Sequence, residues 1–142
     1  MSNAVPEWVP SASRIGQIHS VAIARYGGSP GLRDHACPER CIGGAYMAAL
    51  YEGEDDDVDH LLVVAHLAWL LARNHCFVDG NKRVAWLVLV EALRAAVALD
   101  IDASQADAIA IMLAVADGSV TVAGLHAWLV PRLVPATDLP MA

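Results

Sequence analysis

Apolar residues recur at helical spacing through most of the chain. The first such stretch, 13–26, places its apolar side chains three and four positions apart and ends at two glycines. The same spacing predicts further helices over 39–51, 58–73, 83–99, 104–117 and 121–130. The pattern therefore predicts an all-α fold of about six helices.

Two of these stretches, 58–73 and 83–99, are apolar on nearly every helical face. A helix of this kind belongs in the middle of a domain. Neither stretch offers about 20 uninterrupted apolar residues, because His66 and Glu91 interrupt them, so we interpret both as core helices rather than membrane spans. The residues between them form a polar loop that joins two buried helices.

The remaining stretches set the expected domain limits. Residues 1–12 contain Pro and Ser and are expected to form a flexible lead, in which residues 2–4 resemble an expression-vector remnant. One domain is expected over 13–133, followed by a frayed tail over 134–142. The acidic run 54–57 is interpreted as a solvated loop, with Asp57 placed to cap the next helix.

Composition narrows the class of protein. The chain has 142 residues, 56% of them hydrophobic, which suits one domain with its own core. A net charge of −7 gives no general attraction to nucleic acid or to an anionic membrane, so neither is expected as a partner. No N-terminal signal segment is recognised, and a cytoplasmic location is expected. Because the net charge is negative, a site for polyphosphate must be formed by a local group of positively charged residues.

Three cysteines, Cys37, Cys41 and Cys76, do not suggest a disulfide framework in a chain of this length. A zinc site made by His35, Cys37 and Cys41, with His60 as a distant fourth ligand, lacks the paired spacings of structural zinc sites. Buried or loop cysteines without a role are the favoured interpretation.

The loop and helix start at 75–83 carry more chemistry than a simple connection needs. A helix N-terminus offers unpaired N–H groups and the positive end of the helix dipole, which together suit phosphate. Gly80 lets the backbone approach an anion closely, while Lys82 and Arg83 supply positive charge. Asn81 can fix the loop or donate to phosphate. These residues predict a phosphate-binding site.

Other residues of the same loop can act on a bound phosphate. His75 can take a proton from an attacking hydroxyl, and Asp79 offers the hard oxygen ligands that Mg²⁺ prefers beside phosphate. Phe77 is expected to point into the core and anchor the loop. Plainer interpretations remain open: His75 as a histidine that caps a helix end, Asp79 as an N-cap, and Lys82 with Arg83 as a solvated basic pair.

At this point the motif resembles the signature of the Fic/Doc family, His-x-Phe-x-Asp/Glu-Gly-Asn, a small residue or Lys, and then Arg. In this chain it is His75-x-Phe77-x-Asp79-Gly80-Asn81-Lys82-Arg83. The segment 26–34, with the sequence YGGSPGLRD, is similar to a segment of the death-on-curing (Doc) branch. The resemblance covers roughly residues 13–130.

The resemblance implies a compact Fic fold in which the two buried central helices are joined by the motif loop. It also implies one of two reactions. Fic proteins typically move AMP from ATP to a hydroxyl of a target, whereas the Doc branch acts as a kinase. The AMP-transferring pattern has a small residue at the position of Lys82 and a second Arg at the position of Trp86. Both departures favour a Doc-type kinase.

The resemblance assigns roles residue by residue. His75 is expected to be the general base or the group that orients the target hydroxyl, Asp79 to hold Mg²⁺, and Arg73 to support the site. Phosphate or nucleotide binding is expected of a larger set, Gly80, Asn81, Lys82, Arg83 and Arg73. The expected cofactors are ATP and Mg²⁺.

The Doc branch also implies partners. Its target is elongation factor Tu, whose phosphorylation arrests translation, and a separate antitoxin restrains it. No inhibitory Ser/Thr-x-x-x-Glu spacing occurs in this chain, so an antitoxin acting in trans is expected. Arg33 and Asp34 are interpreted as a local ion pair that holds the glycine loop, with a target-positioning flap as the alternative. Fic-type AMP transfer and a catalytically silent protein-binding module are the competing functions.

Overall fold

The computed structural model describes residues 4–53 and 58–136. Within these ranges the elements are α1 (Ala12–Tyr26), α2 (Cys37–Glu52), α3 (His60–Arg73), α4 (Asn81–Val97), β1 (Leu99–Ile101), α5 (Gln105–Ala116), α6 (Val122–Leu129), the 3₁₀ helix η1 (Val130–Arg132) and β2 (Leu133–Pro135). The predicted all-α class is confirmed. The structure adds a short antiparallel pair of strands that the apolar pattern did not predict.

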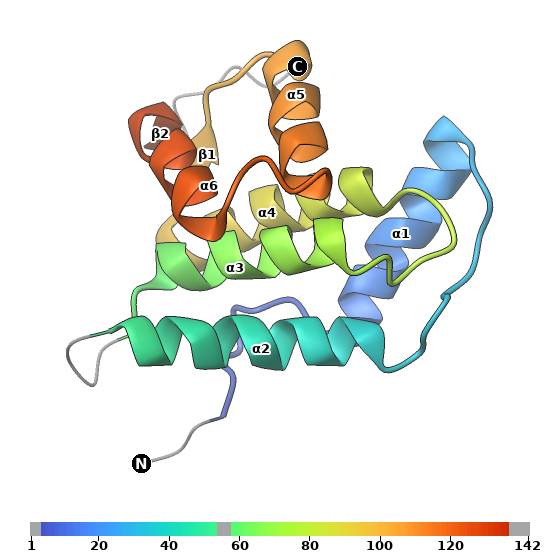
Figure 1. Ribbon diagram of the computed structural model, residues 1–142, viewed down its shortest axis with the longest axis horizontal. Coiled ribbons are helices and arrows are strands. Elements are labelled where there is room, and N and C mark those ends of the chain that lie inside the picture. The colour runs from blue at the N-terminus through green and yellow to red at the C-terminus, as the bar shows by residue number, and fades with distance from the viewer. Residues whose placement is uncertain (1–3, 54–57, 137–142) are drawn as a thin grey trace.

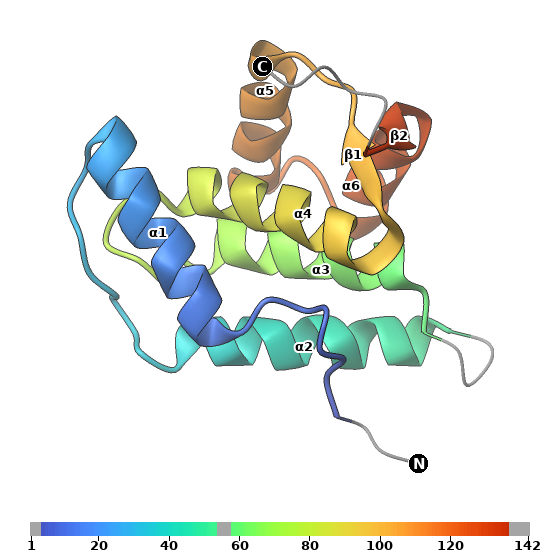
Figure 2. The same ribbon diagram turned by 180° about the vertical axis from the view of Figure 1, so that it is seen from behind.

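The two central helices are α3 and α4, which lie side by side and pack extensively on each other (Figure 1). α2 covers α3 on one side, and α5 and α6 cover the opposite side. Seen from behind, α1 crosses α4 (Figure 2). Leu67 and Leu71 of α3 and Leu89 of α4 are almost completely buried, which confirms that both helices form the core.

Short polar side chains cap most helix starts. Ser104 accepts a hydrogen bond from the Asp107 N–H at 3.1 Å, as its capping-box spacing predicts. α3 is capped by Asp59, whose carboxylate accepts from the Leu62 N–H at 3.3 Å. The cap of α3 is thus not Asp57, which lies outside the described residues.

α4 differs from its predicted limits at both ends. It begins at Asn81, two residues before the predicted start at Arg83, so Lys82 lies in its first turn together with Arg83. It ends at Val97 because Ala98 takes a left-handed conformation, with φ of 56°, and directs the chain into β1. The charged residues at the end of the motif are therefore part of a rigid helix.

The structure differs from the expected lead and tail. In the lead, Val9 is buried and the ring of Trp8 lies 5.1 Å from that of His60, so this part packs against the start of α3. At the other end, β2 pairs with β1 in the register Leu99 to Pro135. Residues 133–135 are a strand and not part of a frayed tail. Pairing across the intervening α5 and α6 is a long-range contact that local spacing cannot reveal.

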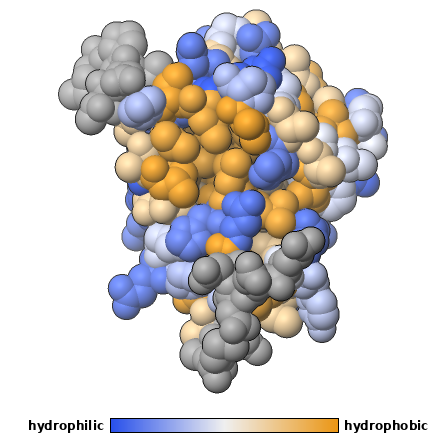
Figure 3. All heavy atoms as spheres, turned by 90° about the vertical axis from the view of Figure 1, so that its left-hand side faces the viewer, coloured by the Kyte–Doolittle hydropathy of each residue, from blue (hydrophilic) through white to orange (hydrophobic). Residues whose placement is uncertain are grey.

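Several large apolar side chains lie on the surface of the protein. On the face shown in Figure 3, apolar residues form a broad patch with hydrophilic residues around it. Among large apolar residues, Tyr51 is 84% exposed and Val21 is 64% exposed. In the described part of the chain, no helix combines the length and the apolar character that crossing a membrane requires.

Candidate active site

The motif loop runs from the end of α3 to the start of α4. His75 is exposed and has a φ of 50°, a left-handed conformation that residues other than glycine rarely adopt. The next two residues, Cys76 and Phe77, are buried, which confirms the prediction that Phe77 anchors the loop in the core. Within three residues the chain thus passes from an exposed histidine to the buried side chains that anchor the loop.

Asn81 holds the loop in shape. Its side-chain Nδ2 donates to the Phe77 carbonyl at 2.9 Å, and its Oδ1 accepts from the Phe77 N–H at 3.0 Å. Both polar groups of the side chain are therefore used inside the loop. Of the two predicted roles, the structure supports fixing the loop, and this role uses one of the two N–H donors of the side-chain amide.

Asp79 presents an exposed carboxylate at the loop tip. It accepts hydrogen bonds from the backbone N–H groups of Ser29, at 3.1 Å, and Gly80, at 2.9 Å. These two bonds lower the pKa of Asp79 below its usual range, so the carboxylate is ionised at neutral pH. A Cβ atom at Gly28 would lie 2.7 Å from Asp79 Oδ2, so only glycine allows the segment before α2 to approach this closely.

The carboxylate of Asp79 fits a Mg²⁺ ion that is otherwise bound by phosphate and water, since such ions use one or two protein carboxylates. The alternative role of Asp79 as an N-cap is not supported. The N-cap of α4 is Gly80, with φ of 79°, and no side chain caps this helix.

The start of α4 is free to bind an anion. Its first turn contains no acidic residue. Among the hydrogen bonds of the described residues, none uses the backbone N–H of Asn81, Lys82 or Arg83, while the Val84 N–H already donates to the Gly80 carbonyl. These free N–H groups lie beside two cationic side chains, which is the arrangement that favours phosphate.

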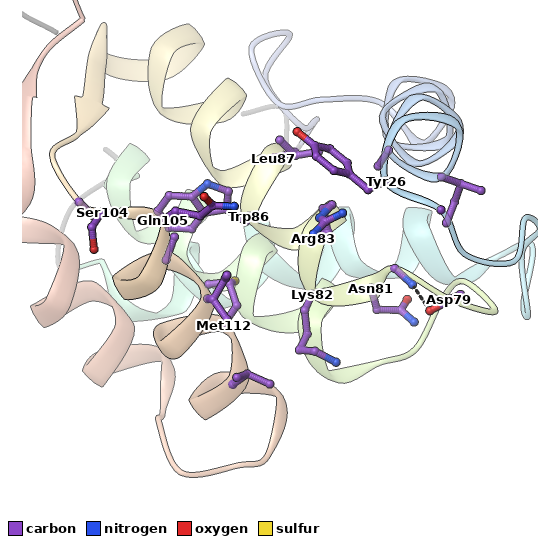
Figure 4. A pocket seen from close by; sticks show the side chains of 18 residues that line it. Tyr26, Asp79, Asn81, Lys82, Arg83, Trp86, Leu87, Ser104, Gln105 and Met112 are labelled. Atoms are coloured by element: carbon purple, nitrogen blue, oxygen red, sulfur yellow. Dashed lines mark hydrogen bonds between the residues drawn. The ribbon is translucent and has the colours of Figure 1, made fainter. Parts of the chain in front are cut away.

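A cleft of about 600 Å³ opens beside this helix start (Figure 4). The polar end of the cleft is formed by residues 79–83, and Trp86, Leu87 and Met112 contribute apolar surface farther along α4 and on α5. The guanidinium carbon of Arg83 lies 4.0 Å from the centre of the Tyr26 ring, which holds the cation at the mouth between α1 and α4. The cleft thus joins a cationic end to an apolar one.

A histidine from α1 supports the loop from below. His19 is buried, its ring stacks on Phe77 with centroids 4.0 Å apart, and its Nε2 lies 2.9 Å from the Asp79 carbonyl. Because a carbonyl can only accept, Nε2 carries the proton and donates. Sequence reasoning assigned His19 no role. Its position on the apolar face of 13–26, one helical turn from Ile15, was the available signal.

The segment before α2 pairs with the motif loop. The Val78 N–H donates to the Gly31 carbonyl at 3.0 Å, and the Arg33 N–H donates to the Cys76 carbonyl at 2.8 Å. Asp34 pairs with Arg40 of α2 and not with Arg33, so the predicted local ion pair is wrong. The backbone contacts hold this segment alongside the motif loop, and we use the name flap for residues 27–36.

Comparison with known proteins agrees with this geometry. A model of the Fic/DOC family matches residues 10–93, more than half of the chain. The chain belongs to the Fic/DOC family. It is 38% identical over 68 residues to the "Protein kinase doc" of Escherichia phage P1, a match that covers 48% of this chain and 52% of that protein. The chain thus matches about half the length of this curated relative, and the resemblance to the Doc branch is confirmed.

Two residues that the Fic/DOC resemblance assigned to the site, Arg73 and His75, do not line its cleft. Arg73 Nη1 donates to the carbonyls of Val115, at 3.2 Å, and Ala116, at 3.4 Å, and the guanidinium lies over the Trp69 ring. A cation at the last carbonyls of α5 stabilises that helix end. Arg73 therefore joins α3 to α5, and the structure does not bring it to the phosphate-binding end. His75 also does not line the cleft and stands beside it on the loop.

The cysteines of this Fic/DOC chain are arranged differently from every sequence-based interpretation. Cys37 and Cys76 form a disulfide, and Cys41 is a buried free cysteine whose Sγ lies 3.8 Å from that of Cys76. The interpretation as cysteines without a role is therefore wrong for Cys37 and Cys76. Neither His35 nor His60 joins the described cluster of candidate metal ligands, which consists of the three cysteines.

Proposed function

We propose that this Fic/DOC protein is a Doc-type toxin that transfers phosphate from ATP to a hydroxyl group of a protein target. The observation that carries the proposal is the free N-terminus of α4, with Lys82 and Arg83, at the polar end of a cleft that continues as apolar surface. The name of the phage relative, a protein kinase, supports the same reaction.

ATP suits the two ends of this cleft. Its phosphates fit the backbone N–H groups of residues 81–83, the Lys82 ammonium and the forked Arg83 guanidinium. Its adenine ring fits the apolar surface that includes Trp86 and Met112. Asn81 contributes through its backbone and by shaping the loop, since its side chain is occupied by Phe77.

Asp79 is the residue proposed to hold Mg²⁺. Its ionised carboxylate is exposed, and its backbone partners at Ser29 and Gly80 fix its orientation. The ion, when bound, neutralises negative charge on the phosphates. His19 of α1 donates a hydrogen bond to the backbone carbonyl of Asp79. Because this carbonyl and the carboxylate belong to the same residue, α1 helps to fix the position of the proposed metal ligand.

His75 is proposed to act as the general base. A histidine can accept the proton of a serine or threonine hydroxyl as that oxygen attacks the γ-phosphorus of ATP, while ADP leaves. The exposed position of His75 next to the flap suits a target that is itself a folded protein. The flap and the motif loop then form one continuous surface around the incoming hydroxyl.

The proposal favours transfer of phosphate over transfer of AMP. AMP-transferring members of the family resemble this chain but have a second Arg at the position of Trp86. Trp86 lines the cleft and its ring lies edge-on to that of Trp128, with centroids 6.3 Å apart. An indole cannot neutralise phosphate, so this part of the cleft offers apolar contact in place of charge.

The family resemblance supplies the remaining parts of the proposal. The target is elongation factor Tu, modification in the cytoplasm arrests translation, and a separate antitoxin restrains the toxin.

A transfer assay tests the proposal. Purified elongation factor Tu is incubated with the protein, Mg²⁺ and ATP labelled at either the α or the γ phosphate, with His75→Ala as the control. We expect label from the γ position that the variant does not transfer. Label from the α position would establish AMP transfer instead, and the absence of label from both would point to a different target or to a silent binding module.

A further inference from the structure

A disulfide ties the motif loop to the start of α2. Cys37 is the first residue of α2, and Cys76 lies between His75 and Phe77, with the two Cα atoms 5.3 Å apart. Cys76 is completely buried and Cys37 is 3% exposed. No part of the proposed reaction uses either sulfur, so the bond requires an explanation of its own.

The bond acts on the residue next to the proposed base. The backbone of Cys76 is already fixed on one side, since its carbonyl accepts from the Arg33 N–H of the flap. The disulfide fixes its side chain as well. His75, whose backbone has the unusual φ of 50°, directly precedes this doubly held residue, so its position depends on how firmly Cys76 is held.

We propose that Cys37 and Cys76 form a reversible thiol–disulfide pair whose oxidised state fastens the motif loop to α2 and so sets the position of His75. The link to His75 as a general base rests on the proposed function. The pair itself rests on the contacts of the sulfur atoms and on the place of the two residues in the fold.

The positions of the three cysteines distinguish their chemistry. Cys37 occupies the first position of a 16-residue helix and is bonded to Cys76, whereas Cys41 is a free cysteine. Burial raises the pKa of the Cys41 thiol to about 11, so Cys41 stays protonated at neutral pH. Cys41 is close enough to contact Cys76, but a protonated thiol is a poor nucleophile. The structure therefore assigns the exchange to Cys37 and makes Cys41 its matched control.

The exchange needs a small disulfide and its thiol, such as the two forms of glutathione. The Cys37 thiolate attacks one sulfur of the small disulfide, which releases one small thiolate and leaves a mixed disulfide on Cys37. Cys76, deprotonated, then attacks the Cys37 sulfur and releases the second small thiolate. Two protein thiols are oxidised and one small disulfide is reduced to two thiols, and the reverse sequence reduces the pair.

Both cysteines of the pair are buried, whereas residues 33–36, which immediately precede Cys37, are exposed. Exchange therefore requires local opening of this segment and is slow compared with exchange of a surface disulfide.

The test uses the whole chain equilibrated in buffers of reduced or oxidised glutathione. Free thiols are alkylated and located by mass spectrometry, and amide hydrogen exchange is followed in peptides that cover residues 74–80, with peptides from α5 as an internal reference. We expect one free thiol, on Cys41, in the oxidised buffer and three in the reduced buffer. Exchange in 74–80 should be about tenfold faster after reduction, with α5 much less affected.

Two variants sharpen the test. Cys37→Ala should exchange in residues 74–80 like the reduced wild type in both buffers, whereas Cys41→Ala should keep the redox response. Three free thiols in both buffers, equal exchange rates in the two states, or one tightly held Zn²⁺ in the reduced protein would overturn the proposal. If no phosphate is transferred in either state, the proposed function fails, while the thiol count and exchange rates still decide whether the pair exists.

Discussion

The side-chain amide of Asn81 forms hydrogen bonds with both the N–H and the carbonyl of Phe77, at 3.0 and 2.9 Å. This pairing closes the motif loop on itself and joins its buried anchor to the first residue of α4. The loop is thus shaped by hydrogen bonds within the chain itself. The same bonds fix the direction of the free N–H groups at the start of α4.

Substitution of Asn81 by Ala should therefore destabilise the protein. Both backbone groups of Phe77 lose their partner in a partly buried position, which should lower the free energy of unfolding by about 2 kcal/mol. Urea denaturation measures this change. Asn74→Ala is the control, because its side chain makes one exposed bond to the Leu70 carbonyl, and its cost should stay below about 1 kcal/mol. Equal costs for the two variants would contradict the role given to Asn81.

Removal of the His19 hydrogen bond should weaken the proposed Mg²⁺ ligand. His19→Phe keeps a ring that can stack on Phe77 but cannot donate to the Asp79 carbonyl. The expected result is a several-fold increase in the Mg²⁺ concentration that supports half-maximal transfer, as is usual when a partner of a metal ligand is removed. His66→Phe, at a buried histidine that pairs with Glu52 far from the loop, should leave this concentration unchanged.

Asp79 should make stability depend on pH in the acid range. Its pKa in the folded state is depressed below the usual value near 3.8, first by the Ser29 N–H and then by the Gly80 N–H. A depressed pKa stabilises the folded state above the unfolded value, and this contribution disappears as the pH falls through the folded value. Urea denaturation of wild type and Asp79→Asn should show a difference at pH 6 that shrinks below about pH 4. A difference that grows on acidification would be the opposite of this expectation.

Two arginines of the same region should respond differently to loss of charge. Arg73→Leu removes bonds to two carbonyls of α5 and should reduce the free energy of unfolding by about 1–2 kcal/mol, with little effect on nucleotide affinity. Arg83→Leu should weaken ATP binding about tenfold or more. Calorimetric titration with an ATP analogue and urea denaturation of both variants separate the two roles. Weaker nucleotide binding by the Arg73 variant would show that Arg73 does contribute to the binding site.

The extent to which sequence predicted this site follows from the range of the interactions involved. The buried anchor Phe77 and the charged start of α4 were predictable because they depend on neighbours within a few residues, whereas Asp79 also bonds to Ser29, 50 positions away. The Cys37–Cys76 bond joins residues 39 positions apart, and the link from His19 to Asp79 joins residues 60 positions apart. Such partners are brought together by helix packing, and no local pattern marks them.

The same reasoning accounts for the elements that were missed. β1 and β2 have three residues each, too few to show a period of two, and the partner strand of each lies more than 30 residues away in the sequence. Arg73 was assigned to phosphate because it is close to His75 in the sequence. The helical turn directs its side chain toward α5 instead, where the carbonyls of Val115 and Ala116 attract it.

The pairing of β1 with β2 also has a mechanical consequence. These strands bracket α5 and α6, so residues 99–135 form an arm that leaves α4 and is fastened to itself at its base. One wall of the cleft is carried by this arm through Met112, while the opposite wall belongs to α1 and α4. The width of the cleft that a nucleotide would enter is therefore set partly by the three residue pairs of β1 and β2, none of which lines the cleft. Loosening this pairing would widen the cleft without changing any residue that lines it.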